Sequence, residues 1–173
     1  MESTPSAAPP FGSLLLDTNL WLDYYLAMRP GHELACRLIE RACNRNVELL
    51  YTVGGSKDLY YLVALYFKRA ARAADATGAG ELSPTQAQAA TQTAWACVYH
   101  LDEIATAVGC DQSDVWMARK QRTIHHDYED DLVIAAALRA AGTCLVTNDM
   151  QLIAHAPVAA LTPADALAYL EES

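Results

Sequence analysis

Short apolar runs that end at polar residues recur along this chain and alternate with segments of helical periodicity. The first run covers residues 13–17, where three leucines lead into Asp17. Comparable runs cover residues 47–53, 143–147 and 158–161. Apolar runs of this length are typical of parallel strands that are buried on both faces. Strands that alternate with helices predict a three-layer α/β/α fold with a central, mostly parallel sheet.

The segments between these runs have the spacing of amphipathic helices, and capping residues mark several of their ends. Ser56 is the expected N-cap of a helix at residues 57–72. Asp127 is the expected N-cap of a helix at residues 128–141, which Gly142 ends. The other expected helices cover residues 19–28, 33–44, 84–100, 111–122, 149–156 and 163–170.

The length of 173 residues suits a single domain. We expect a flexible N-terminal tail at residues 1–12, which are rich in Ser, Ala and Pro, and one domain at residues 13–171. Residues 70–100 hold two glycines and Pro84 between two helical patterns. This composition indicates a helical insertion within the domain.

The composition restricts the class of protein further. With 53% hydrophobic residues the chain can bury a full core, which excludes global disorder. No apolar run is long enough to span a bilayer, and the first ten residues lack the basic end and apolar stretch of a signal peptide. We therefore expect a cytoplasmic protein. The five cysteines form no Cys-x-x-Cys pair, so we expect buried thiols rather than disulfides or zinc ligands.

The net charge of −9 is unfavourable for a protein that coats nucleic acid, because such proteins carry a basic face. However, seven of the 21 acidic residues fall where the predicted topology gathers side chains at one edge of the sheet. Without those seven, the acidic and basic residues are nearly balanced. The acidity therefore indicates a site rather than a general surface property. The seven acids are Asp17, Asp58, Asp127, Glu129, Asp130, Asp131 and Asp149.

Four of these acids are expected close to the carboxyl ends of strands. Asp17 ends the first apolar run, and Asp149 follows a later one. Asp58 and Asp130 are expected in the first turns of two helices. Ligands of parallel sheets bind beyond the carboxyl ends of the strands. Taken singly, most of these acids are explained equally well as helix caps or dipole partners, so their convergence carries the prediction.

Carboxylates that converge raise one another's pKa, and a cation between them relieves the repulsion. Hard oxygen ligands suit Mg²⁺ or Mn²⁺, which retain waters and accept phosphate oxygens. Such a metal activates water and stabilises the leaving oxygen of a phosphodiester. A site made of carboxylates alone therefore points to the hydrolysis of phosphate esters rather than to zinc chemistry.

Three segments resemble, in order, the signature motifs of PIN-domain ribonucleases, particularly toxins of the VapC type. Residues 15–19, Leu-Leu-Asp-Thr-Asn, resemble the opening Asp-x-Asn signature. Residues 127–137, Asp-Tyr-Glu-Asp-Asp-Leu-Val-Ile-Ala-Ala-Ala, resemble the central acidic motif and its Ala-rich helix. Residues 145–149, Leu-Val-Thr-Asn-Asp, resemble the closing strand-Thr-x-Asp motif. The resemblance extends from Ser13 to about Leu170.

This resemblance implies an Mg²⁺- or Mn²⁺-dependent endoribonuclease that is usually a homodimer and is usually neutralised by a small antitoxin protein. It implies that Asp17 and Asp130 are the principal metal ligands. Asp149 would complete the site directly or through water. Asn19 and Thr147 would orient ligands through hydrogen bonds.

Asp58 completes the expected catalytic set of Asp17, Asp58, Asp130 and Asp149, and Asp131 is a supporting residue. Asp58 is the best match to the second acid of the family, which is commonly Glu and therefore one methylene longer. Asp131 is the alternative to Asp130 as a ligand and otherwise supports it. We choose Asp130 because its spacing from Asp127 places both on one edge of a helix.

Two other functions stay open at this point. A phosphatase of the haloacid-dehalogenase type would need an acid where Asn19 stands, whereas another magnesium-dependent phosphoesterase, such as a 5′-nuclease, would not. A non-catalytic PIN-like module that binds a protein would be expected to have lost some of the acids. The basic residues Arg119, Lys120 and Arg122 are either contacts for RNA phosphates or a solvated helix end.

Overall fold

The sheet at the centre of the computed structural model contains five parallel strands within the described residues, in the order β3-β2-β1-β4-β5. The structure describes residues 11–74, 81–122 and 127–172. The parallel sheet confirms the predicted α/β fold. The strands are β1 (Ser13–Leu16), β2 (Glu48–Thr52), β3 (Thr106–Val108), β4 (Thr143–Val146) and β5 (Ala160–Leu161).

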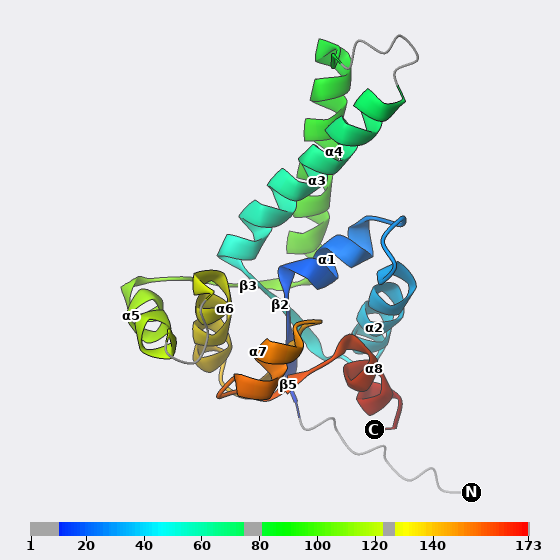
Figure 1. Cartoon of the computed structure of the whole chain (residues 1–173). Helices are drawn as coiled ribbons and strands as arrows, with labels where there is room; N and C mark the ends of the chain where they lie inside the picture. Colours follow the sequence, from blue (N-terminus) through cyan, green and yellow to red (C-terminus); the bar gives the residue numbers. More distant parts are fainter. Residues whose placement is uncertain (1–10, 75–80, 123–126, 173) are drawn as a thin grey trace, which may run out of the picture.

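Helices cover both faces of this sheet (Figure 1). They are α1 (Thr18–Tyr25), α2 (His32–Asn44), α3 (Val53–Ala73), α4 (Pro84–Ile104), α5 (Gln112–Gln121), α6 (Tyr128–Arg139), α7 (Met150–His155) and α8 (Pro163–Glu172). Leu14 and Leu16 of β1 pack with α1, α2 and α8 on one face, and Leu15 packs with α6 and α7 on the other. The alternation follows from the two-residue period of a strand.

Helix α3 begins earlier than the sequence pattern predicts. Its N-cap is Thr52 and not Ser56, and the Thr52 hydroxyl accepts a hydrogen bond from the N–H of Gly55 at 2.9 Å. Gly54 and Gly55 therefore lie in the first helical turn instead of in a connecting loop. Asp58, expected in the first turn, lies beyond it, so the alternative explanation of Asp58 as a partner of the helix dipole is wrong.

Helices α3 and α4 form a long hairpin that projects away from the sheet (Figure 1). The part of the chain predicted as a helical insertion, residues 70–100, includes the distal ends of both helices. Helix α4 continues to Ile104 and leads into β3, a strand that the sequence pattern does not predict. β3 has only three residues, and two of them are exposed, so it lacks an apolar run.

The cysteines are less buried than expected. All five are free thiols, and only Cys144 is fully buried. Cys36 and Cys97 are half-buried, whereas Cys43 and Cys110 are exposed. The expectation of core positions is therefore wrong for the last two, because Cys43 lies on the outer side of α2 near its end and Cys110 follows the edge strand β3.

The helices in the described part of the chain are too short or too polar to cross a membrane. Most of the tail expected at residues 1–12 lies outside the described residues. Within it, the ring of Phe11 packs against that of Tyr169, with 5.7 Å between the centroids.

Candidate functional site

An acid follows each of the two neighbouring strands at the centre of the sheet. Asp17 comes directly after β1, and Asp149, the N-cap of α7, follows β4. The N–H of Asp17 donates to the carbonyl oxygen of Val146 at 3.0 Å, which holds the two strand ends together. The order of the strands reverses between β1 and β4, and a crevice for ligands opens at such a point.

An open pocket of about 440 Å³ occupies this crevice. Asp17 and Asn19 reach it from the start of α1, Asp130 from the first turn of α6, and Asp149 from the start of α7. The structure therefore brings together these four residues, all of which the sequence analysis selects. We call this the acidic pocket. Its lining residues are Asp17, Asn19, Arg29, Asp127, Glu129, Asp130, Val133, Asn148 and Asp149.

Thr147, which follows β4, links two acids of the pocket. Its side chain is fully buried, and its hydroxyl donates to Oδ2 of Asp17 at 3.0 Å. The same hydroxyl oxygen accepts the backbone N–H of Asp149 at 3.1 Å. This threonine therefore orients the Asp17 carboxylate and the start of α7 together.

Burial raises the pKa of the Asp17 carboxyl above its ordinary value. The hydroxyl of Thr147 and the backbone N–H groups of Thr18 and Asn19 oppose this shift, because they donate to the charged form. The negative charge of Asp149 adds to the rise in pKa. A cation in the acidic pocket would therefore favour the ionised form of Asp17.

Glu129 is a pocket residue to which the sequence analysis gives no role, although it counts Glu129 among the converging acids. Burial is the main reason that the pKa of Glu129 is raised. The charges of Asp58, Asp127 and Asp17 raise it further. Repulsion among carboxylates therefore extends beyond the acids that the motifs single out.

Two of the pocket acids are also helix caps. The Asp127 carboxylate accepts the N–H of Glu129 at 2.8 Å. Oδ1 of Asp149 accepts the N–H groups of Gln151 and Leu152 at 2.7 and 3.1 Å. The capping explanation is thus correct for both residues. It does not compete with a role in the site, because each cap fixes a carboxylate at a helix start that faces the pocket.

Among the described residues, no group of three His, Cys, Asp or Glu side chains is arranged closely enough to hold a metal ion unaided. The pocket offers carboxylate oxygens and the amides of Asn19 and Asn148. This set fits Mg²⁺, which keeps several waters and binds proteins through one or two carboxylates plus substrate phosphates. The residues present therefore suit a hard cation that a phosphate group helps to hold.

The sequence profile of the PIN domain matches residues 13–151, a range that contains every residue of the acidic pocket. The chain belongs to the PIN-domain family. This match confirms the predicted family. PIN domains are generally nucleases, and this activity agrees with the chemistry of the pocket.

The fold of this PIN domain is similar to that in the crystal structure of FitAcB from Neisseria gonorrhoeae. The TM-score is 0.58 at 16% sequence identity, and the match covers 87% of this chain and 98% of the other. Similarity at this level of identity shows a shared fold. A search of curated proteins gives no match.

Asp58 of the PIN domain lies outside the acidic pocket, which differs from the prediction. It forms an ion pair with Lys57 at 3.0 Å and lines a second pocket of about 330 Å³. The two pockets share Glu129 and Val133 as lining residues. The early start of α3 at Val53 is the reason, because it moves Asp58 along the helix and away from the strand end.

Of the adjacent acids Asp130 and Asp131, Asp130 lines the acidic pocket and Asp131 does not. Asp131 is only 2% exposed. Neighbouring residues of a helix point in different directions, since each advances about 100° around the axis. The placement supports the choice of Asp130 as the ligand.

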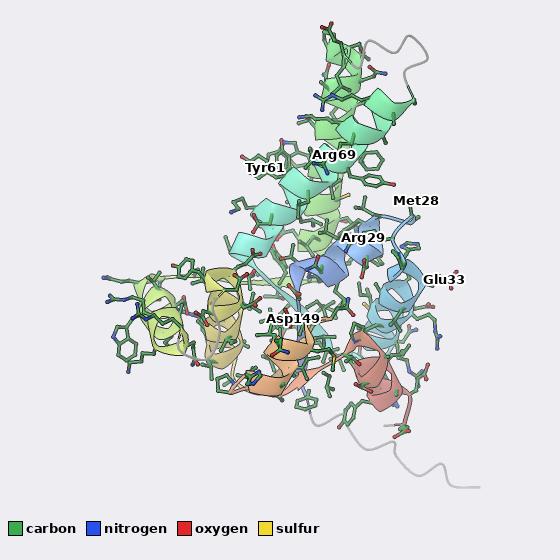
Figure 2. The ribbon with its side chains drawn as sticks, in the orientation of Figure 1. Met28, Arg29, Glu33, Tyr61, Arg69 and Asp149 are labelled. Carbon is green, nitrogen blue, oxygen red and sulfur yellow. The ribbon has the colours of Figure 1, made fainter. Side chains whose placement is uncertain are left out.

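Arg29 is a pocket residue that the sequence analysis missed. It follows α1 (Figure 2). Its guanidinium pairs with the buried carboxylate of Asp23. The sequence signal that could have identified Arg29 is the acid Asp23 in the preceding helix, with which Arg29 pairs. Arg29 therefore places a positive charge among the carboxylates of the acidic pocket.

The basic residues of α5 line neither pocket. Arg119 and Lys120 lie in the last turn of α5, and Arg122 is its C-cap. The amine of Lys120 lies 3.5 Å from the centroid of the Trp116 ring. The structure therefore does not bring these predicted RNA contacts to the acidic pocket.

Proposed function

We propose that this PIN domain is an Mg²⁺- or Mn²⁺-dependent endoribonuclease that hydrolyses phosphodiester bonds of RNA. The observation that carries the proposal is the convergence of Asp17, Asp130 and Asp149 in one pocket, with Glu129 beside them. Grouped carboxylates repel one another, and a divalent cation that also binds phosphate relieves this cost. Membership of a family that consists generally of nucleases supports the same reaction.

In this proposal Asp17 and Asp130 are the principal metal ligands, and Asp149 completes the site directly or through water. The metal, when bound, polarises the phosphodiester and activates the attacking water. Thr147 keeps the Asp17 carboxylate in position through its hydrogen bond. Arg29 contacts a non-bridging phosphate oxygen and offsets the charge of the substrate.

We further propose that the protein is the toxin of a toxin–antitoxin pair, with a small antitoxin protein as partner, and that it acts as a homodimer. Large aromatic side chains are exposed on the α3–α4 hairpin: Tyr61 is 63%, Trp95 48% and Tyr99 66% exposed (Figure 2 labels Tyr61). The rings of Trp95 and Tyr99 lie 5.8 Å apart. An apolar surface of this kind supports burial against another protein.

The test of the nuclease compares the wild type with Asp17→Asn, Asp130→Asn and the control Asp102→Asn. Asp102 lines neither the acidic pocket nor the second pocket beside it. Calorimetry with Mg²⁺ and Mn²⁺, and cleavage of a mixed-sequence RNA and its DNA counterpart, are measured on each. We expect the first two variants to lose metal binding and RNA cleavage and the control to keep both.

Unchanged RNA cleavage by Asp17→Asn would overturn the mechanism. Equal, weak heats for the wild type and Asp130→Asn, without cleavage, would instead indicate a PIN module that binds a protein. Preferred hydrolysis of a phosphomonoester or of DNA would indicate another phosphoesterase. The toxin role predicts growth arrest of a bacterial host on expression, and light scattering tests the dimer.

A further inference from the structure

The second pocket lies between the start of α3, the loop after β3, and α6. Its volume is about 330 Å³, at the lower end of the range for small-ligand pockets. Apolar side chains form most of the wall, namely Val108, Leu132, Val133 and Ala136. Gly54 and Gly55 expose the backbone of α3 on the opposite side. The pocket therefore suits one flat, largely apolar group.

This pocket and the acidic pocket are neighbours along one edge of α6. Glu129 and Val133, which are one helical turn apart, line both of them. A chain that enters the acidic pocket with a phosphodiester can therefore continue directly into the second pocket. In a nucleic acid strand, the group next to each phosphate is a sugar that carries a base.

Polar groups also line the second pocket, and two of them can pair with the edge of a base. Lys57 and Asp58, paired at 3.0 Å, supply a donor and an acceptor at the start of α3. Tyr128 lines the pocket and is 56% exposed, so its ring is available for stacking. Proteins recognise unpaired bases of RNA by stacking them on aromatic rings and by hydrogen bonds to their edges.

We propose that the second pocket receives an unpaired nucleobase of the RNA strand whose phosphodiester lies in the acidic pocket. This inference rests on the proposed nuclease function and adds a base-specificity site to it. It gives Asp58 a role in reading the base edge, in place of the metal contact that the sequence pattern suggested. An unpaired base explains the pocket better than a protein side chain does, because the pocket adjoins the acidic pocket and shares Glu129 and Val133 with it.

The structure offers two positions for filling the pocket without disturbing its walls. A Cβ atom built on Gly54 or on Gly109, both of which line the pocket, meets no atom within 4 Å. Gly54→Phe and Gly109→Phe are therefore designed to place a ring at the pocket without a clash at the Cβ. Gly12→Phe is the matched control, because a Cβ there also meets nothing within 4 Å and Gly12 lies before β1.

The experiment uses an RNA oligonucleotide whose cleavage position has been mapped with the wild-type protein. Each nucleotide that flanks the cleaved bond is replaced in turn by an abasic nucleotide. We expect the wild type and Gly12→Phe to cleave one of the abasic substrates about 10-fold more slowly or worse, as loss of a stacked base predicts. Gly54→Phe and Gly109→Phe should cleave the intact and abasic substrates at the same reduced rate.

Thermal unfolding is measured on each variant, and a cooperative transition shows that the variant is folded. Wild-type cleavage that does not depend on either flanking base would overturn the proposal. So would a folded Gly54→Phe or Gly109→Phe that discriminates as well as the wild type, and a protein side chain would then be the occupant to test. Absence of any RNA cleavage by the wild type would refute the proposed function itself, which is a different result.

Discussion

Replacement of Thr147 by valine tests the link between the centre of the sheet and the acidic pocket. Thr147→Val keeps the shape of the side chain but removes the hydrogen bonds to Oδ2 of Asp17 and from the N–H of Asp149. A hydrogen bond to a charged group contributes about 1.5–3 kcal/mol, and an ordinary one about 1 kcal/mol. Since the added methyl group offsets part of this loss, we expect the free energy of unfolding to fall by about 2–3 kcal/mol at neutral pH.

The pH dependence of this effect has a defined sign. The bond from Thr147 lowers the pKa of Asp17, so Thr147→Val raises that pKa further. The difference in stability between the wild type and the variant is therefore largest above the pKa of Asp17 and shrinks as the pH falls through it. The acidic limb of the pH–rate profile should move to higher pH in the variant.

The assay combines urea unfolding at several pH values with titration of Mg²⁺. Thr147→Ser is the control, because it keeps the hydroxyl and loses only a methyl group. Partners that orient metal ligands typically contribute 10- to 100-fold to affinity, so we expect Thr147→Val to bind about 10-fold more weakly than the control. If Thr147→Val matches Thr147→Ser in stability, pH dependence and Mg²⁺ affinity, the reasoning about Thr147 is wrong.

Three further predictions concern single positions. Gly55→Ala places a Cβ within 2.8 Å of two threonine hydroxyl oxygens and should cost about 1–3 kcal/mol in urea unfolding, whereas Gly54→Ala, with open space around its Cβ, should be nearly neutral. Gly142→Ala should cost about 1–2 kcal/mol, because φ is +84° at this helix end. Burial raises the folded-state pKa of Asp17 above 3.8, so the metal-free protein should lose stability as the pH rises through the acidic range. Asp17→Asn should lack that part of the loss, and equal pH slopes of the urea midpoint would contradict this.

The sequence was sufficient to locate the acids that sit at strand ends. Asp17 follows a run of leucines that is typical of a buried strand, and Asp149 follows a run of the same kind. Parallel strands bring their carboxyl ends to one edge, so two positions far apart in sequence became neighbours in the prediction. Asp130 could be placed because the N-cap Asp127 fixes the start of α6.

The remaining parts of the site depend on features that a local pattern does not encode. The adjacent Gly54 and Gly55 suggested a loop before the helix, but Thr52 caps α3 ahead of them. Asp58 therefore lies further along α3 than expected, and it lines the second pocket. Arg29 lines the acidic pocket and pairs with Asp23, a contact that no local pattern predicts. Contacts of this kind are set by the tertiary structure, and the periodicity of a single sequence does not predict them.

The uneven burial of the α3–α4 hairpin has a consequence for how the molecule moves. The buried residues of α3 are Leu59, Val63 and Ala64, and the last of them lies near the middle of the helix. The later turns of α3 have no buried side chain among the described residues, so their backbone amides should exchange with solvent through small, local openings. We expect such local openings of the last turns of α3 to leave the buried contacts of Leu59 and Val63 in place.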